Sequence, residues 1–236
     1  KHFIAKFVSS TDVYPVVKAE YIAMRLAALA GLNVAPVSLV SSLGKDVLMI
    51  ERFDRVDTAT GKTRRLMLSG LSLLDLNEME ARYASYSDLA DRIRQRFTEP
   101  QATLMELFKR LVFNVLVGNT DDHARNHSAF WDGHQLSLTP AYDICPQLRT
   151  GQEATQAMDI GGVACKAATL VNVLSVCGKF QLRESDARTM IEQLITVVED
   201  NWVAVCEEAG LAAVERERLW GRALLNPYCL QDWKPA

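Results

Sequence analysis

The chain has 236 residues, of which 49% are hydrophobic, so it can bury a substantial core as one large domain or two fused lobes. Its formal net charge of −3 argues against direct DNA binding, because a phosphate backbone is bound by clustered Lys and Arg. Charged residues or proline interrupt the most apolar stretches, residues 21–40 and 194–206, so no membrane span of ~20 apolar residues is expected. The five cysteines are Cys145, Cys165, Cys177, Cys206 and Cys229. They contain no Cys-x-x-Cys pair, which argues against a zinc site, and their odd number and wide spacing favour a reducing cytoplasm.

The first third of the chain predicts a small unit of mixed strand and helix. Alternation of apolar residues favours strands at residues 3–8, 37–40 and 47–52, whereas the periodicity of residues 15–30 favours a helix. From residue 55 to 62 the composition becomes polar and turn-forming, so we place a boundary there. The expected division is a small unit of residues 1–56 and a larger one of residues 57–236.

Helices are expected to dominate the larger unit. Apolar residues recur with helical periodicity in residues 87–97, 101–117, 166–176, 185–208 and 211–225. A single hairpin is expected at residues 128–138, with Asp132 and Gly133 at the turn, where positive backbone dihedrals are needed.

The densest polar segment follows the helix of residues 101–117 and reads Gly-Asn-Thr-Asp-Asp-His-Ala-Arg-Asn at residues 118–126. Asp121 and Asn126 are five residues apart. In phosphoryl transfer, a carboxylate with this spacing orients the attacking hydroxyl and the amide oxygen binds magnesium. Asp143 follows the second strand of the hairpin and so returns to the same end of the sheet, where it could hold a second metal position. The ordered set indicates kinase chemistry.

The same template gives roles to residues near the start of the chain. Lys6 lies on the first predicted strand, where a kinase needs an ammonium group to bridge the α- and β-phosphates of ATP. Glu20 lies on the following helix and could pair with Lys6. The segment Met49-Ile50-Glu51-Arg52-Phe53 leaves the last strand of the small unit, where backbone groups of kinases contact the adenine edge.

Each of these residues also has a purely structural interpretation. Lys6 could be a solvent-facing lysine that protects an edge strand, and Glu20 could favour the helix macrodipole. Asp121 and Asn126 could stabilise turns. His123 and His127 have the spacing of a helical zinc pair, but the turn-forming composition predicts a loop. His123 is instead expected to point at the transferred phosphate, as the Asp-x-His-x-x-Asn spacing of phosphatidylinositol kinases suggests.

Three motifs resemble the hallmarks of HipA kinases: Ile50-Glu51-Arg52-Phe53-Asp54-Arg55, Thr120-Asp121-x-His123-Ala124-x-Asn126 and Pro140-x-Tyr142-Asp143. The resemblance implies an α+β, bilobal protein-kinase-like fold, with a small mixed lobe followed by a large, mainly helical lobe. It also implies ATP-dependent activity on serine or threonine of a protein substrate, as the toxin of a bacterial toxin–antitoxin pair. The implied partner is a HipB-like helix-turn-helix antitoxin, through which alone the chain would meet DNA.

The resemblance further implies Asp121 as catalytic base, Asn126 and Asp143 as Mg²⁺ ligands, Lys6 on the ATP phosphates, and Glu51 and Phe53 at the adenine hinge. The segment Asp143-Ile144-Cys145 lacks the glycine of the Asp-Phe-Gly motif, and no glycine-rich phosphate loop precedes Lys6. We therefore expect an N-terminal segment or a separate chain to complete the small lobe. Two other functions fit the same residues: a small-molecule or lipid kinase, and a catalytically silent binding module.

Overall fold

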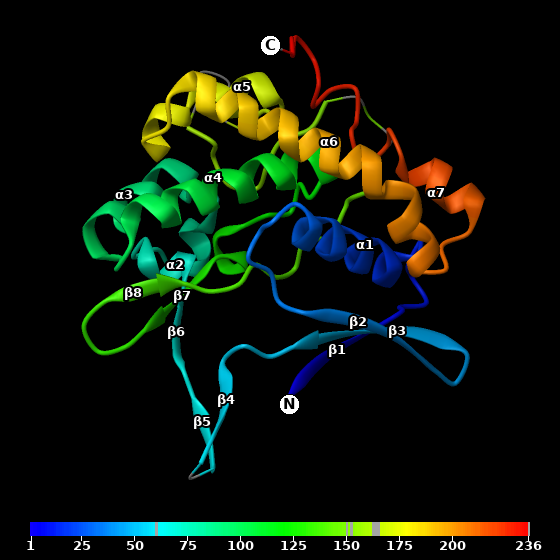
Figure 1. Cartoon of the computed structure of the whole chain (residues 1–236), viewed down its shortest axis with the longest axis horizontal. Coiled ribbons are helices and arrows are strands. Elements are labelled where there is room, and N and C mark those ends of the chain that lie inside the picture. The colour runs from blue at the N-terminus through cyan, green and yellow to red at the C-terminus, as the bar shows by residue number, and fades with distance from the viewer. Residues whose placement is uncertain (60, 150, 152, 162–165, 236) are drawn as a thin grey trace.

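A computed structural model describes the chain except for residues 60, 150, 152, 162–165 and 236. Its first part is an antiparallel sheet with strand order β1-β3-β2, covered on one face by helix α1 (Figure 1). The bounds are β1 (Phe3–Phe7), α1 (Val16–Leu29), β2 (Val37–Ser42) and β3 (Lys45–Glu51). All four elements were predicted from the sequence, with ends that differ by at most two residues. Lys6 pairs with Leu48 in the register of β1 and β3.

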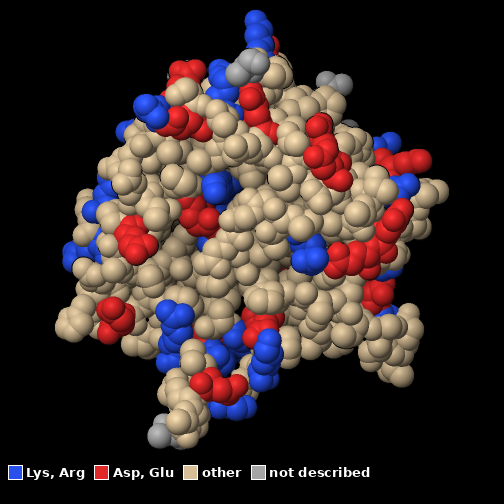
Figure 2. Space-filling model, in the orientation of Figure 1, with Lys and Arg blue, Asp and Glu red and all other residues tan. Residues whose placement is uncertain are grey.

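A second hairpin projects from the molecule at the point where the sequence predicted only a boundary (Figure 1). It consists of β4 (Arg55–Thr58) and β5 (Gly61–Arg64), and its side chains are mostly exposed. Lys and Arg side chains gather around this hairpin, interspersed with acidic ones (Figure 2). The prediction of a single hairpin beyond residue 56 was therefore wrong, because polar, turn-forming residues also suit a solvated β-hairpin. The expected boundary at residue 56 lies inside β4.

The predicted hairpin at residues 128–138 is confirmed and belongs to a second three-stranded sheet, with order β6-β7-β8. Its strands are β6 (Leu66–Ser69), β7 (Ser128–Trp131) and β8 (Leu136–Leu138). At the turn, Asp132 Oδ1 accepts hydrogen bonds from the backbone N–H groups of His134 and Gln135, both at 2.8 Å. Gly133 has a φ of 103°, which explains the glycine at this position.

The remaining elements are helical. They are α2 (Gly70–Leu73), α3 (Tyr86–Arg96), α4 (Pro100–Val117), α5 (Leu170–Ser175), α6 (Glu184–Glu208) and α7 (Ala213–Leu219), with 3₁₀ turns η1 (Glu78–Tyr83), η2 (Ala124–Asn126) and η3 (Cys177–Phe180). The predictions for α3, α4 and α6 are confirmed. The helices predicted at residues 166–176 and 211–225 were too long. Thr169 caps α5 by accepting a hydrogen bond from Asn172 N–H, and Trp220 leaves helical geometry at the end of α7.

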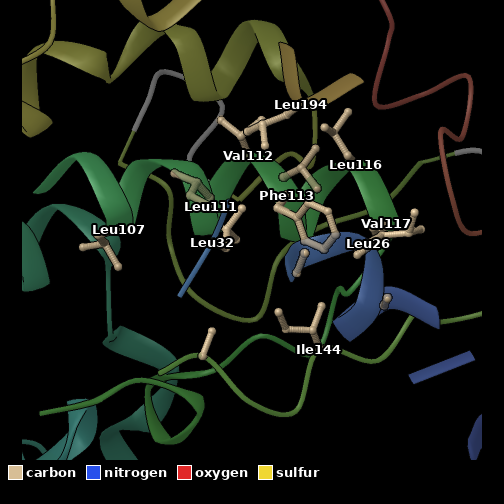
Figure 3. Close-up of a cluster of buried hydrophobic side chains, with 14 of the residues drawn as sticks. Leu26, Leu32, Leu107, Leu111, Val112, Phe113, Leu116, Val117, Ile144 and Leu194 are labelled. Atoms are coloured by element: carbon tan, nitrogen blue, oxygen red, sulfur yellow. The ribbon is translucent and has the colours of Figure 1, made fainter. Parts of the chain in front are cut away.

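Helix α4 lies at the centre of the hydrophobic core. Figure 3 shows Leu111, Val112, Phe113 and Leu116 of α4 packed among side chains from α1, α6 and the segment that follows β8. Phe113 has no exposed surface. Burial of a side chain of this size contributes about 1.5–3 kcal/mol to the free energy of folding. The core therefore fixes α4, whose carboxyl end carries the polar segment of residues 118–126.

Two sequence expectations concern membranes and cysteines. Within the described part of the chain, no helix combines the length and apolarity needed to cross a membrane. Cys145, Cys177, Cys206 and Cys229 are free thiols, whereas Cys165 lies outside the described residues.

Candidate active site

The polar loop begins where α4 ends at Gly118, which adopts a left-handed conformation with a φ of 69°. A Cβ atom at this position would lie 2.4 Å from the carbonyl oxygen of Ala223, so glycine is required by both conformation and space. Beyond Gly118 the chain turns through η2 into β7. Within this loop Asp121 is exposed to solvent, whereas Asn126 is buried. The end of α4 thus presents a carboxylate at the surface and an amide beneath it.

Lys6 of β1 forms ion pairs with Glu20 of α1 and with Asp143 of the segment after β8. Its Nζ lies 2.7 Å from Glu20 Oε1 and 2.9 Å from Glu20 Oε2, and it also donates a hydrogen bond to Asp143. Burial alone would lower the pKa of Lys6, but the charges of Glu20 and Asp143 raise it above its ordinary value. Burial raises the pKa of the Glu20 carboxyl, and the Lys6 ammonium opposes this. The lysine is therefore held as a cation between β1, α1 and the segment after β8.

Asp143 and Asn126 form the second half of the site. Asn126 Nδ2 donates a hydrogen bond of 2.8 Å to Asp143 Oδ2. Asp143 has a φ of 61°, a conformation that aspartate tolerates better than most residues. The buried Oδ1 of Asn126 has no hydrogen-bond partner. Carboxylate and amide oxygens are the ligands that Mg²⁺ accepts, so this pair fits the cation.

Few protein ligands are present for such a cation. The described residues contain no cluster of three or more His, Cys, Asp or Glu side chains arranged around a metal position. Mg²⁺ commonly needs only one or two carboxylates when phosphate oxygens and water complete its coordination. The pair of Asp143 and Asn126 is thus suited to a metal that arrives with a phosphate ligand rather than to a permanently bound one.

Two cavities meet at Lys6 and Asp143. The first has a volume of about 410 Å³ and is mainly apolar; its other lining residues are Ile4, Ile50, Glu51, Arg52, Phe53, Asp54, Met67 and Tyr142. The second has a volume of about 270 Å³, and its lining includes Asp12, Glu20, Asn119, Asp121, Asn126, Cys145 and Gln147. The rings of Phe130 and Tyr142 pack against Phe53, each with a centroid distance of 5.8 Å. The arrangement suits a ligand with a flat apolar end and an anionic end.

The structure brings seven of the eight residues expected at the site into these cavities. Lys6, Glu51, Phe53 and Asp143 line the first; Lys6, Glu20, Asp121, Asn126 and Asp143 line the second. His123 lines neither cavity. It is half-buried, and its buried Nδ1 has no hydrogen-bond partner.

Sequence reasoning missed several residues near the site. Cys145 and Gln147 line the second cavity, and burial raises the pKa of the Cys145 thiol to about 12, which keeps it neutral. The position of Cys145 two residues after Asp143 could have indicated it. Asp122 is buried beneath the loop, although its neighbour Asp121 is exposed. The sequence offers no signal that separates these two adjacent aspartates.

Curated relatives of this chain are named kinases. It is 32% identical over 146 residues to the putative kinase Y4mE of Sinorhizobium fredii, an alignment that covers 60% of this chain and 33% of the relative. It is 28% identical over 141 residues to the serine/threonine-protein kinase toxin HipA of Shewanella oneidensis, covering 53% of this chain and 33% of the relative. The chain thus spans about a third of the length of these relatives.

Two solved structures share the fold. The complex of Shewanella oneidensis HipA, HipB and operator DNA matches with a TM-score of 0.79 and 21% identity, over 97% of this chain and 58% of the matched chain. The Helicobacter pylori proinflammatory kinase CtkA matches with a TM-score of 0.66 and 16% identity, over 92% of this chain and 81% of the matched chain. The mixed helix and sheet architecture is therefore that of HipA-like kinases. Because residues 1–202 match the family model of the HipA-like C-terminal domain, the chain belongs to this family.

Proposed function

We propose that this chain carries the nucleotide site and catalytic loop of an ATP-dependent serine/threonine protein kinase. The observation that carries the proposal is the convergence of Lys6, Asp121, Asn126 and Asp143 on one polar cavity that adjoins an apolar one. These residues come from β1, the loop after α4 and the segment after β8. A cation, two carboxylates and an amide at one end of an apolar slot match the requirements of phosphoryl transfer from ATP.

In this proposal the adenine occupies the apolar cavity. Phe53 supplies an aromatic surface, and the backbone of Glu51 and its neighbours provides hydrogen-bonding groups at the end of β3. Lys6 contacts the phosphates, held by Glu20 in the orientation that the structure records. Asp143 and Asn126 would hold Mg²⁺, which when bound neutralises phosphate charge. The side-chain order along the cavities then follows the order of groups along ATP.

Asp121 is the proposed catalytic base. Its exposed carboxylate can accept a hydrogen bond from a hydroxyl group that enters from solvent, which orients the hydroxyl oxygen toward the terminal phosphate. We propose His123 as a second catalytic residue because it lies two positions from Asp121 and has a buried ring nitrogen without a partner.

The biological setting belongs to the proposal as well. We propose a small lobe of residues 1–56 and a helical lobe of residues 57–236, a protein substrate, and action in the cytoplasm as a toxin. A HipB-like antitoxin is the proposed partner. The support is family membership, together with the likeness to a HipA whose structure contains HipB and operator DNA.

Calorimetric titration with ATP tests the nucleotide site. We expect the wild-type chain to bind ATP in the presence of Mg²⁺, and Asp143→Asn to weaken this binding at least tenfold. Asparagine tolerates the positive φ of position 143, so the variant removes charge with little backbone strain. The matched control is Asp121→Asn, which should bind ATP like the wild type. Equal affinity of Asp143→Asn and wild type would refute the assignment of Asp143.

A further inference from the structure

A cluster of buried polar side chains lies beneath the catalytic loop. Asp122 Oδ2 accepts hydrogen bonds from the Tyr86 hydroxyl and from His127 Nε2, the latter at 3.1 Å. Asn114 Nδ2 lies 3.4 Å from the Tyr86 hydroxyl oxygen. None of these four residues is more than 3% exposed. A buried carboxylate is costly unless donors compensate for its lost hydration. The two hydrogen bonds to Asp122 supply that compensation.

The cluster is separate from the two cavities of the site, since none of its four members lines either one. Its members therefore do not contact the proposed ligand, and any effect on the reaction must pass through other residues.

The position of the cluster in the chain shows which residues these are. Asp122 directly follows Asp121, and His127 directly follows Asn126. The hydrogen bond between Asp122 and His127 thus joins the two ends of the segment that carries the proposed base and metal ligand. Tyr86 lies on the buried face of α3 and ties this pair to that helix, and its ring packs on the His127 ring at a centroid distance of 5.3 Å.

We propose that Asp122 and His127 are positioning residues that fix Asp121 and Asn126 relative to each other for phosphoryl transfer. This inference rests on the proposed function. Displacement of a reacting group by about 1 Å can reduce the rate about 10²-fold. The adenine cavity and the pair of Lys6 and Glu20 lie on other elements. Loss of the contact between Asp122 and His127 should consequently reduce the turnover number much more than the affinity for ATP.

The test compares His127→Leu with His127→Gln, measured by hydrolysis of Mg²⁺-ATP in water with Asp121→Asn as the inactive reference. The amide of glutamine can place an N–H donor where Nε2 of His127 lies, whereas leucine cannot. We expect kcat to fall 30-fold or more in His127→Leu with less than a threefold change in KM for ATP. His127→Gln should recover most of the lost kcat. Tyr86→Phe, which removes only the hydroxyl, should reduce kcat in the same sense and serves if His127→Leu fails to fold.

Two results would overturn the inference: wild-type kcat in both His127→Leu and Tyr86→Phe, or equal losses in His127→Leu and His127→Gln. If the wild type hydrolyses no more ATP than Asp121→Asn, the proposed function fails, and hydrogen exchange then tests the pair by itself. Amides of residues 120–127 should exchange at least tenfold faster in His127→Leu than in the wild type, with α4 unchanged. Unchanged exchange in that loop would refute the pair's positioning role.

Discussion

At the scale of single residues, the most informative contact is the one between Lys6 and Glu20. Glu20 is 3% exposed, and both oxygens of its carboxylate accept a hydrogen bond from Lys6 Nζ. The ammonium group therefore has two tasks in our account: it compensates a buried carboxylate in the free protein, and it contacts phosphate in the complex. Substitutions that separate these tasks are informative.

Lys6→Met should abolish tight ATP binding and also destabilise the fold, since it leaves Glu20 buried without its cation. Removal of one partner of a buried charged hydrogen bond costs about 1–3 kcal/mol. The pKa of Glu20, already raised by burial, should rise further, so protonation then favours the folded state. The loss relative to wild type should be small below about pH 4.3 and grow as the pH rises from there. Denaturant melts at pH 4 and pH 7 measure the difference.

The double variant Lys6→Met/Glu20→Gln is the control for this prediction. It removes the buried charge together with its partner, so stability at pH 7 should return toward the wild-type value while ATP binding stays lost. A stability loss in Lys6→Met that is the same at pH 4 and pH 7 would contradict the role assigned to Glu20.

Much of the candidate site could be predicted from residue type and spacing, because the proposed phosphoryl transfer requires few kinds of side chain in a fixed order. Asp121, Asn126 and Asp143 could be selected in this way. The burial of Asp122 could not be predicted, since adjacent residues of a loop have no periodicity that assigns them to a face. The role of His123 stays a prediction: its spacing suggested the phosphate, and its side chain lines neither cavity.

At the scale of secondary structure elements, the junction between α4 and the polar loop that follows it has the strictest requirements. Gly118 and Gly31 both follow helices and have similar φ values of 69° and 75°. A Cβ atom at Gly31 would meet nothing within 4 Å, whereas one at Gly118 would collide with the backbone of Ala223. Alanine at Gly31 would therefore introduce conformational strain alone, whereas alanine at Gly118 would introduce the same strain and a steric collision.

We predict that Gly31→Ala costs about 1 kcal/mol, the usual penalty for alanine in a left-handed conformation. Gly118→Ala should cost at least about 1 kcal/mol more, because backbone must move as well, and it should reduce kinase activity by shifting the loop. Chemical denaturation and ATP hydrolysis of both variants test this. Equal stability of the two variants would contradict the described packing of Gly118.

The long helices and the sheet β1-β3-β2 could be predicted because their apolar periodicity reflects a shared core. The hairpin of β4 and β5 could not, since both strands are largely exposed and their composition is that of a loop. The ends of α5 and α7 are set by local turns and caps, which apolar periodicity does not record.

At the scale of the whole molecule, a short bridge links the loop after α1 to the segment that leads to Asp143. Ala35 N–H donates to Ala141 O at 2.9 Å, and Ala141 N–H donates to Asn33 O at 2.7 Å. Arg110 of α4 is 2% exposed and donates to the carbonyl oxygens of Asn33 and Thr139, at 3.1 and 2.9 Å. Burial lowers the pKa of this guanidinium, and the nearby Glu106 opposes that effect. The bridge fixes the segment that carries Asp143 relative to the sheet.

Arg110→Met should destabilise the protein by about 1–3 kcal/mol, because it leaves the carbonyl oxygen of Thr139 without its donor and removes one of the two donors to Asn33 O and to Glu106. It should also weaken ATP binding by loosening the segment that carries Asp143. The matched control is Arg183→Met on the surface, where the ion pair with Asp186 is exposed and stability should not change measurably. Thermal melts and ATP titrations of both variants decide the matter. Wild-type melting of Arg110→Met would show that the bridge does not depend on Arg110.

The central claim is that the loop after α4 transfers phosphate from ATP, and labelled ATP tests it most directly. The wild-type chain and Asp121→Asn are incubated with γ-³²P-ATP, Mg²⁺ and a protein extract, and the label on serine and threonine is measured. Our account predicts transfer by the wild type and a loss of about 10²–10⁴-fold in Asp121→Asn, with ATP affinity retained. Equal transfer by the two proteins, at equal ATP affinity, would contradict the assignment of this loop as the catalytic centre.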